Sequence, residues 1–218
     1  MTHEMILLNL PYFGCIAHWA QIVSGAPFAF ETRWRHQRRT FRTRTVIGAS
    51  DGELALTLPS ESDYTKLYTE ACINDATPWR HQHLNAFMSA YSSSPFYEFY
   101  IDDIAQVVNT PFERVWDMNM KLHETLARLM DIDFAPCDYD TTHLAPEDID
   151  MRRGIEPKQQ HILREGLTEV PYYQVFAPQH GFLPWLSVLD LLFEMGPEAR
   201  LVLLKMSGKA ENSKVKNR

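Results

Sequence analysis

The chain has 218 residues, a formal net charge of -7 and a hydrophobic fraction of 45%. These values are typical of one globular domain with its own core, and they exclude a disordered or fibrous protein. Its three cysteines, Cys15, Cys72 and Cys137, are odd in number and widely spaced. They exclude a disulfide framework and indicate reduced thiols in a reducing compartment.

The first sixty residues predict a strand, a helix, a second strand and a hairpin. Apolar side chains recur at helical spacing up to Gly25, between two short apolar runs that are typical of strands. A strand, a helix and a strand with short connections indicate a βαβ unit and a partly parallel sheet. The predicted elements are a strand at 5–10, a helix at 13–25, a strand at 27–31, and a hairpin at 44–58 that turns at Ser50-Asp51-Gly52 and directs Leu54, Leu56 and Leu58 inward.

The rest of the chain predicts a helical middle and a buried C-terminal helix. Thr77-Pro78 and Thr110-Pro111 each pair an N-cap residue with a proline suited to the first helical position. Residues 133–168 are polar and rich in Asp and Pro, so we expect a surface excursion that could form a lid. The other predicted elements are a strand at 67–73, a strand at 171–176, a buried helix within 180–199 that stops at Gly196-Pro197, and a short last element.

We therefore expect a single α/β domain over residues 1–204, with a mixed sheet opened by the βαβ unit. Residues 205–218 are polar and basic, and we expect this tail to be disordered. No apolar run is long enough to span a membrane, since residues 183–193 are too few and include Asp190. The N-terminus has no basic segment typical of a secretory signal. These features predict a cytoplasmic protein.

The most unusual stretch is RWRHQRRTFRTR at residues 33–44, which holds six arginines in an acidic chain. In a strand, Arg38, Arg42 and Arg44 would point to one side, where guanidinium groups can hold phosphate or carboxylate. Alternatively, the cluster could be a charged edge strand, or could pair with the chain's own carboxylates. An acidic surface would repel nucleic acid, so a small phosphorylated ligand suits this charge balance better.

Other polar residues stand out less clearly. His81 and His83 lie two apart in a predicted helix and so diverge, which argues against a shared metal. Either could still be a general base, or simply a core or surface histidine. Asn119, in an apolar helical stripe, could fasten a neighbouring loop or line a pocket. Asp190, in an apolar helix, needs a partner, for which the arginine cluster is a candidate. The sequence contains no phosphate-binding glycine loop and no nucleophile with a nearby base.

Several stretches together resemble the WbqC-like family of bacterial proteins. The similarity lies in the basic strand and hairpin of residues 37–59, in the Trp-Arg helix and Pro-Phe-Tyr segment of residues 75–103, and in three C-terminal blocks at 151–158, 171–176 and 180–199. It covers about residues 5–204 in order. The sequence departs from the family where Arg38 replaces a lysine and Trp185 replaces a frequent asparagine.

The resemblance implies a role in O-antigen or other surface-polysaccharide synthesis, with transfer of a glycyl or acyl group to an amino sugar. Such a protein would bind a phosphorylated or nucleotide-linked ligand; no cofactor is implied. Under this hypothesis Arg38, Arg42 and Arg44 hold phosphate, and His81 or His180 is the base. The pocket would be lined by Tyr12, Trp79, Arg80 and Asp190.

Two rival interpretations remain open. A non-catalytic module that binds a nucleotide or scaffolds the pathway would explain why no nucleophile and base lie together. Nucleotidylyl transfer would need a histidine motif directly after the first strand, where the sequence has Pro11-Tyr12-Phe13-Gly14 and His18 only later. A histidine or carboxylate within reach of the anion site would favour an enzyme.

Overall fold

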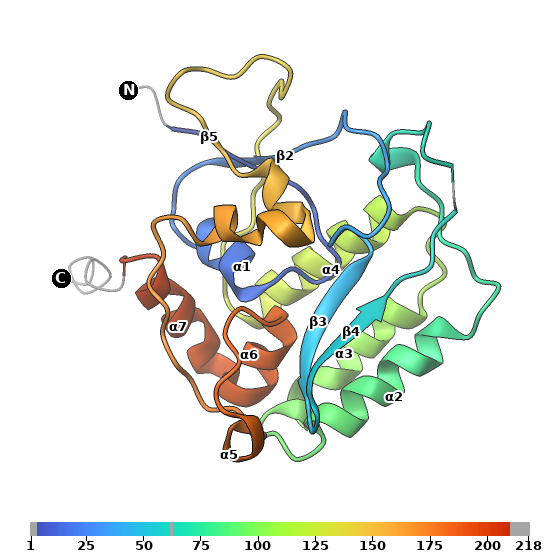
Figure 1. The fold of residues 1–218 in the computed structure, drawn as a ribbon, viewed down its shortest axis with the longest axis vertical. Coiled ribbons are helices and arrows are strands. Elements are labelled where there is room, and N and C mark those ends of the chain that lie inside the picture. The colour runs from blue at the N-terminus through green and yellow to red at the C-terminus, as the bar shows by residue number, and fades with distance from the viewer. Residues whose placement is uncertain (1–3, 62, 210–218) are drawn as a thin grey trace.

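A computed structural model describes residues 4–61 and 63–209. It has a mixed α/β architecture with a parallel sheet, an antiparallel hairpin and helices on both sides of the hairpin (Figure 1). The elements in chain order are β1 (Ile6–Leu8), α1 (Ile16–Ile22), β2 (Phe28–Phe30), β3 (Arg44–Ala49), β4 (Gly52–Thr57), η1 (Tyr68–Glu70), α2 (Trp79–Tyr91), α3 (Tyr97–Asn109), α4 (Val115–Leu129), β5 (Ile149–Asp150), η2 (Arg152–Ile155), η3 (Pro157–Arg164), α5 (Ala177–His180), α6 (Val188–Met195), η4 (Gly196–Glu198) and α7 (Ala199–Met206).

The parallel sheet confirms the predicted βαβ unit. Strand β1 is central, with β2 parallel on one side and β5 parallel on the other. All three residues of β1 are buried, as expected for a strand covered on both faces. The third strand, β5, comes from the polar segment 133–168, which was predicted as a surface excursion. Backbone pairing to β1 therefore anchors part of that segment in the fold.

The hairpin also forms as predicted, with β3 and β4 paired from Arg44↔Thr57 to Ala49↔Gly52. It lies between α2 and α6, both of which pack against β3 (Figure 1). The prediction that the leucines of its second strand point inward is only partly correct. Leu58 and Leu56 are buried, but Leu54 near the hairpin tip is 39% exposed.

Two predicted strands and two predicted helix starts were wrong, and one helix was missed. Helix α2 begins after Pro78 and α4 after Arg114, so neither Thr77 nor Thr110 is an N-cap. Residues 67–73 form the short helical turn η1 and isolated bridges instead of a strand. Residues 171–176 form no strand and lead into the short helix α5. Helix α3 was not predicted. Its buried residues, Tyr97, Ile104, Val107 and Val108, nevertheless recur at helical spacing.

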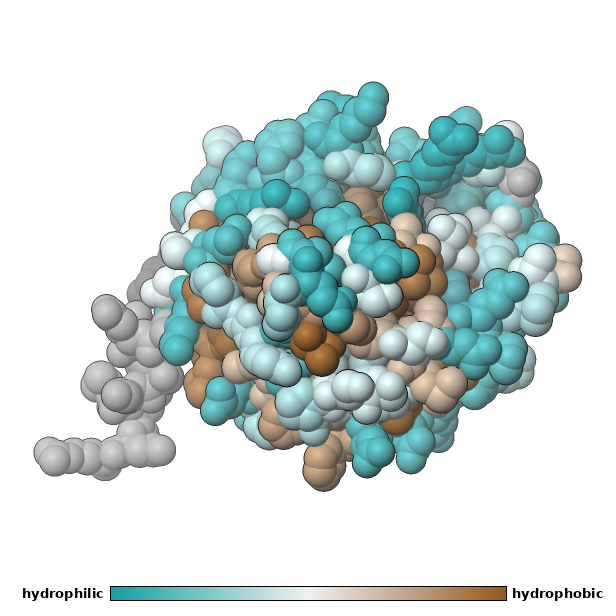
Figure 2. Space-filling view, turned by 60° about the horizontal axis from the view of Figure 1, so that its bottom comes forward, coloured by the Kyte–Doolittle hydropathy of each residue, from teal (hydrophilic) through white to brown (hydrophobic). Residues whose placement is uncertain are grey.

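The core is one continuous cluster that joins the sheet, α1, α4 and α6. On the face that carries α5, hydrophobic residues appear in small groups between polar ones (Figure 2). No helix in the described part of the chain is long and apolar enough to cross a membrane. Of the predicted tail, Lys205 and Met206 complete α7, and residues 210–218 lie outside the described residues.

Candidate functional site

A cavity of about 70 Å³ lies beyond the carboxyl end of β1. Open α/β folds commonly bind their ligands beyond the carboxyl ends of parallel strands. Five segments that are far apart in the sequence form its wall. These are the β1–α1 turn, the start of β3, the tip-side half of β4, the η2–η3 region and residues 184–187.

The β1–α1 turn shapes one wall of the cavity because the backbone reverses there. Phe13 and Gly14 both have positive φ angles, 61° and 78°. A Cβ atom on Gly14 would lie 2.9 Å from Nε1 of Trp19, which donates a hydrogen bond to the Phe13 carbonyl at 2.8 Å. Glycine is therefore required at this position. The turn leaves Tyr12, Gly14 and Cys15 facing the cavity.

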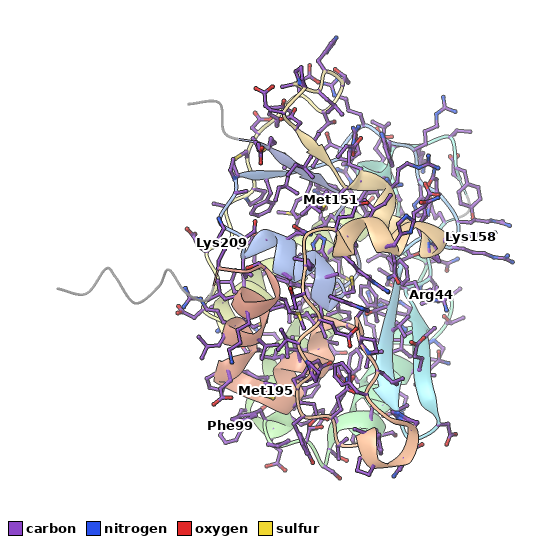
Figure 3. All side chains as sticks on the ribbon, turned by 60° about the vertical axis from the view of Figure 1, so that its left-hand side comes forward. Arg44, Phe99, Met151, Lys158, Met195 and Lys209 are labelled. Atoms are coloured by element: carbon purple, nitrogen blue, oxygen red, sulfur yellow. The ribbon has the colours of Figure 1, made fainter. Side chains whose placement is uncertain are left out.

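Arg44 is the cationic group at the strand side of the cavity. It is the first residue of β3 and lies below η2 and η3, while Lys158 of η3 points outward (Figure 3). Its Nε is buried and has no hydrogen-bond partner among the described residues. A buried guanidinium donor without an acceptor is costly, and an anion is the acceptor that fits it best.

A second guanidinium, that of Arg164 at the end of η3, also lines the cavity. Its Cζ lies 5.2 Å from the centre of the Trp185 ring, so the two side chains make a cation–π pair. Trp185 itself has a positive φ of 65°, which is unusual for a bulky residue. The cavity thus has an arginine on each of two walls and an aromatic plane beside one of them.

The acidic and titratable groups of the cavity are few. Glu53 of β4 lies opposite Gly48 in the hairpin register, and its side chain lines the cavity. Burial raises the pKa of the Cys15 thiol, and it also raises that of the Tyr12 phenol. Both groups are therefore protonated at neutral pH. The Tyr12 hydroxyl is hydrogen-bonded to Nδ1 of His83 at 2.9 Å.

His18 of helix α1, which is 1% exposed, also lines the cavity. Its Nε2 lies 3.2 Å from Nε2 of His123 on α4. The Nδ1 of His123 lies 2.9 Å from the backbone carbonyl of Asn119. Burial lowers the pKa of both rings, that of His123 to about 4, so both are neutral.

The three arginines predicted to share an anion site are separated in the structure. Residues 38–43 form turns, with a positive φ of 56° at Arg39, and β3 begins only at Arg44. The side-to-side alternation of a strand therefore does not apply to Arg38 and Arg42. Arg38 lies on the surface against Tyr64, to which its Nε donates.

Arg42 is completely buried and is not part of the cavity lining. Its Nε and one terminal nitrogen donate to Oδ1 of Asn9 at 3.1 and 2.7 Å, and the other donates to the Arg35 carbonyl at 2.8 Å. Its guanidinium also lies 4.6 Å from the centre of the Tyr68 ring. With these partners, Arg42 joins the first strand to the arginine-rich loop.

The residues predicted at the start of α2 lie together behind Tyr12. Trp79 is buried and its Nε1 donates to Asp75 at 2.8 Å. Arg80 stacks over the Trp79 ring at 4.4 Å and forms an ion pair with the same aspartate. His81 is exposed and lies 2.9 Å from the Asn85 amide. Of these residues none lines the cavity that Tyr12 lines.

Asp190 and His180 occupy a different place in the fold. Asp190 is buried and accepts hydrogen bonds from Tyr91, Tyr172 and Gln174, so its expected arginine partner is not found. Burial raises its pKa. His180 is half-buried, and its Nε2 lies 3.0 Å from the Ala49 carbonyl. Both residues hold the hairpin tip and the segment after residue 170, away from Arg44.

Sequence reasoning missed four cavity residues: His18, Glu53, Arg164 and Trp185. In the sequence, Trp185 stands out only as a departure from the family pattern, and His18 only as lying too far along the chain for nucleotidylyl transfer. Arg164 had no signal, because it lies in an aperiodic polar stretch. Within the described residues, no group of three or more His, Cys, Asp or Glu side chains is arranged to hold a metal ion.

A sequence model of the WbqC-like protein family matches residues 10–149, which is more than half of the chain. The match includes Tyr12, His18 and Arg44 of the cavity. The three C-terminal stretches that resemble the family lie beyond the matched residues. No curated protein and no solved structure gives a significant match. On the extent of the family match, the chain belongs to the WbqC-like protein family.

Proposed function

We propose that the cavity binds a small phosphorylated or nucleotide-linked ligand. The observation that carries this proposal is the Arg44 guanidinium, which lines the cavity and has no hydrogen-bond or ion-pair partner in the described part of the chain; its terminal nitrogens, unlike Nε, are not closed off from water. Arg164 adds a second positive charge, and Trp185 adds an aromatic plane on which a base or sugar ring can stack. Against these two cations the cavity has one carboxylate, Glu53, so its lining favours an anion.

The reaction we propose is transfer of a glycyl or acyl group to an amino sugar or a nucleotide-linked sugar, in the synthesis of a bacterial surface polysaccharide. Family membership supports the pathway, and the anion-binding cavity supports a phosphorylated substrate. His18 and Glu53, which line the same cavity, are the groups available as a base. A nucleotide-linked sugar as substrate would place this reaction in the cytoplasm. His81 and His180, far from the anion site, are weaker candidates for the base.

A second candidate function is ligand binding without catalysis. It is favoured by the position of the two predicted bases, His81 and His180, outside the cavity, and by the lack of a hydrogen bond between the Cys15 thiol and a cavity base in the described residues. A scaffold or sensor of the pathway would need only the two arginines and the aromatic plane. Turnover is the property that separates the two functions.

The test is thermal unfolding of the purified protein with nucleotide sugars, nucleotides, acyl-CoA thioesters and inorganic phosphate. We expect one ligand class to raise the melting temperature, because a ligand present at 100 times its Kd stabilises a protein by about 2.7 kcal/mol. The shift should disappear in Arg44→Ala and persist in Arg38→Ala, a matched control from the same arginine-rich segment. An equal shift in all three proteins would contradict the proposed site.

Transfer is tested separately with the ligand class that binds. The protein is incubated with that nucleotide-linked amino sugar and an acyl or glycyl thioester, and the product is identified by mass spectrometry. A new amide that depends on the protein and on Arg44 supports the transferase. Binding without product at any pH favours the non-catalytic function.

A further inference from the structure

In the buried pair of His18 and His123, the hydrogen-bond partners determine which ring nitrogen carries the proton. The Asn119 carbonyl can only accept a hydrogen bond, so Nδ1 of His123 must carry the proton that it donates. In a neutral His123 the other nitrogen, Nε2, is then an acceptor. Because Nε2 of His18 lies 3.2 Å from it, this atom of His18 must be the donor. The Nδ1 of His18 is left with a lone pair and no proton.

Among the described residues, that lone pair has no hydrogen-bond donor. Nδ1 of His18 has no hydrogen bond to any described residue. Within the described residues, Nδ1 of His18 is not one of the unpartnered polar atoms that are closed off from water, so part of its surface is accessible. The His18 residue is only 1% exposed, and the space next to it is the cavity. A buried acceptor that opens on a cavity is placed to receive a donor from a ligand.

We propose, on the basis of the proposed function, that the ligand donates an N–H or O–H group to Nδ1 of His18, and that His123 is a positioning residue that holds His18 in its Nε2–H tautomer. The substrate class is thereby narrowed. The molecule carries an anionic group for Arg44 and Arg164 and, next to it, an amine or hydroxyl. A phosphate or a nucleotide without such a group would fill only half of the site.

An amino sugar linked to a nucleotide meets both requirements, and His18 then has a defined part in acyl transfer. The amine nitrogen attacks the carbonyl carbon of the acyl thioester, and a C–N bond forms. The C–S bond breaks, and the electron pair leaves with the sulfur as a thiolate. The proton lost by the nitrogen moves to Nδ1 of His18 and from there to the thiolate, so the imidazole ends neutral, as it began.

The first test uses the wild-type protein without ligand. Nitrogen-15 NMR of the imidazole rings reports which ring nitrogen carries a proton. We expect His18 to be protonated at Nε2 and His123 at Nδ1, both neutral at pH 7. A His18 protonated at Nδ1 would overturn the proposal, since the atom facing the cavity would then be a donor. In His123→Phe, which removes the acceptor but keeps a ring, the His18 tautomer preference should weaken; an unchanged preference would remove the positioning role.

The second test compares the binding of two ligands, UDP and UDP-glucosamine, to the wild type, His18→Gln and His18→Asn. His18→Gln retains an amide near the Nε2 position and can still bond to His123, but it has no atom at Nδ1. His18→Asn has its amide near the Nδ1 position instead. We expect His18→Gln to weaken UDP-glucosamine binding about tenfold and to leave UDP binding unchanged. His18→Asn should recover part of the loss, because its carbonyl oxygen can accept the same donor.

The outcomes separate this proposal from the proposed function. If Arg44→Ala abolishes binding of both ligands while His18→Gln binds UDP-glucosamine like the wild type, the anion site stands and the role of His18 is overturned. Binding that survives Arg44→Ala contradicts the anion site itself. A protein that is not stabilised by UDP-glucosamine overturns the present proposal as well.

Discussion

Individual arginines of the 33–44 segment differ in what surrounds them, and so in what their removal would cost. Arg42 is fully buried, with three hydrogen bonds to Asn9 and Arg35, whereas Arg38 lies on the surface against Tyr64. Arg44 lies between these extremes, partly buried at the cavity. The sequence alone does not distinguish the three arginines. In the structure, Arg42 is a structural residue, Arg38 is a surface residue and Arg44 is a candidate ligand contact.

We expect Arg42→Ala to lower the free energy of unfolding by about 3 kcal/mol, because the buried Asn9 oxygen would lose both donors and the Arg35 carbonyl would lose its donor. Urea denaturation followed by circular dichroism measures this. Arg38→Ala is the control and should change the same quantity by less than about 0.5 kcal/mol. Equal effects of the two substitutions would contradict the structural role of Arg42.

At the scale of elements, the η2–η3 region depends on one glycine. A Cβ atom at Gly154 would lie 2.5 Å from Cγ of Leu163, which is closer than side chains can pack. Gly154 and Leu163 both line the cavity. The absence of a side chain at position 154 therefore lets η3 lie close to η2 and brings Arg164 toward the cavity.

We expect Gly154→Ala to destabilise the fold by about 1–3 kcal/mol and also to weaken ligand binding, because η3 must move to relieve the contact. The two effects are measured by urea denaturation and by the ligand-dependent rise in melting temperature. Leu163→Ala combined with Gly154→Ala provides the control. The double variant should recover ligand binding relative to Gly154→Ala, and no recovery would show that this contact does not position η3.

Elements with a local signal could be predicted, and those that depend on distant contacts could not. The βαβ unit and the hairpin follow from periodicity and turn residues within single segments. The predicted strand at 67–73 failed because its apolar residues serve the turn η1, whose Tyr68 hydroxyl reaches the Leu10 carbonyl at 2.8 Å. The same limit applies to the site. Tyr12 and Arg44 were predicted, but no local pattern links them to Arg164 or Trp185.

At the scale of the whole molecule, buried ionisable groups make stability depend on pH in two opposite ways. Burial lowers the pKa of His83 and of His123 to about 4 from 6.5. As pH falls below 6.5 the unfolded chain takes up protons that the folded chain does not, so the free energy of unfolding falls until about pH 4. Glu194 acts in the other direction, since burial raises its pKa to about 7 from 4.5.

The stability that protonated Glu194 contributes is fully present below pH 4.5, and it is lost as the pH rises through about 7. Glu194→Gln should therefore stabilise the protein relative to the wild type more at pH 8 than at pH 4. Its amide oxygen can still accept from Ser94 and Val175, the donors to Oε1 in the wild type. Urea denaturation of both proteins at the two pH values measures the difference. A difference that does not change with pH would mean that Glu194 titrates normally.

The pairing of β1 with β5 has a consequence for the order in which the protein folds. β1 meets β2 across one short helix, but the hydrogen bond from the Met5 backbone to Asp148 joins residues 143 positions apart. Closing so long a loop costs more chain entropy than pairing near neighbours, so we expect β5 to join the sheet late. The η2–η3 wall follows β5 directly along the chain. During synthesis, before the last third of the protein has left the ribosome, the chain can form the hairpin and pair β1 with β2. It cannot yet form the cavity, because the η2–η3 wall is still missing.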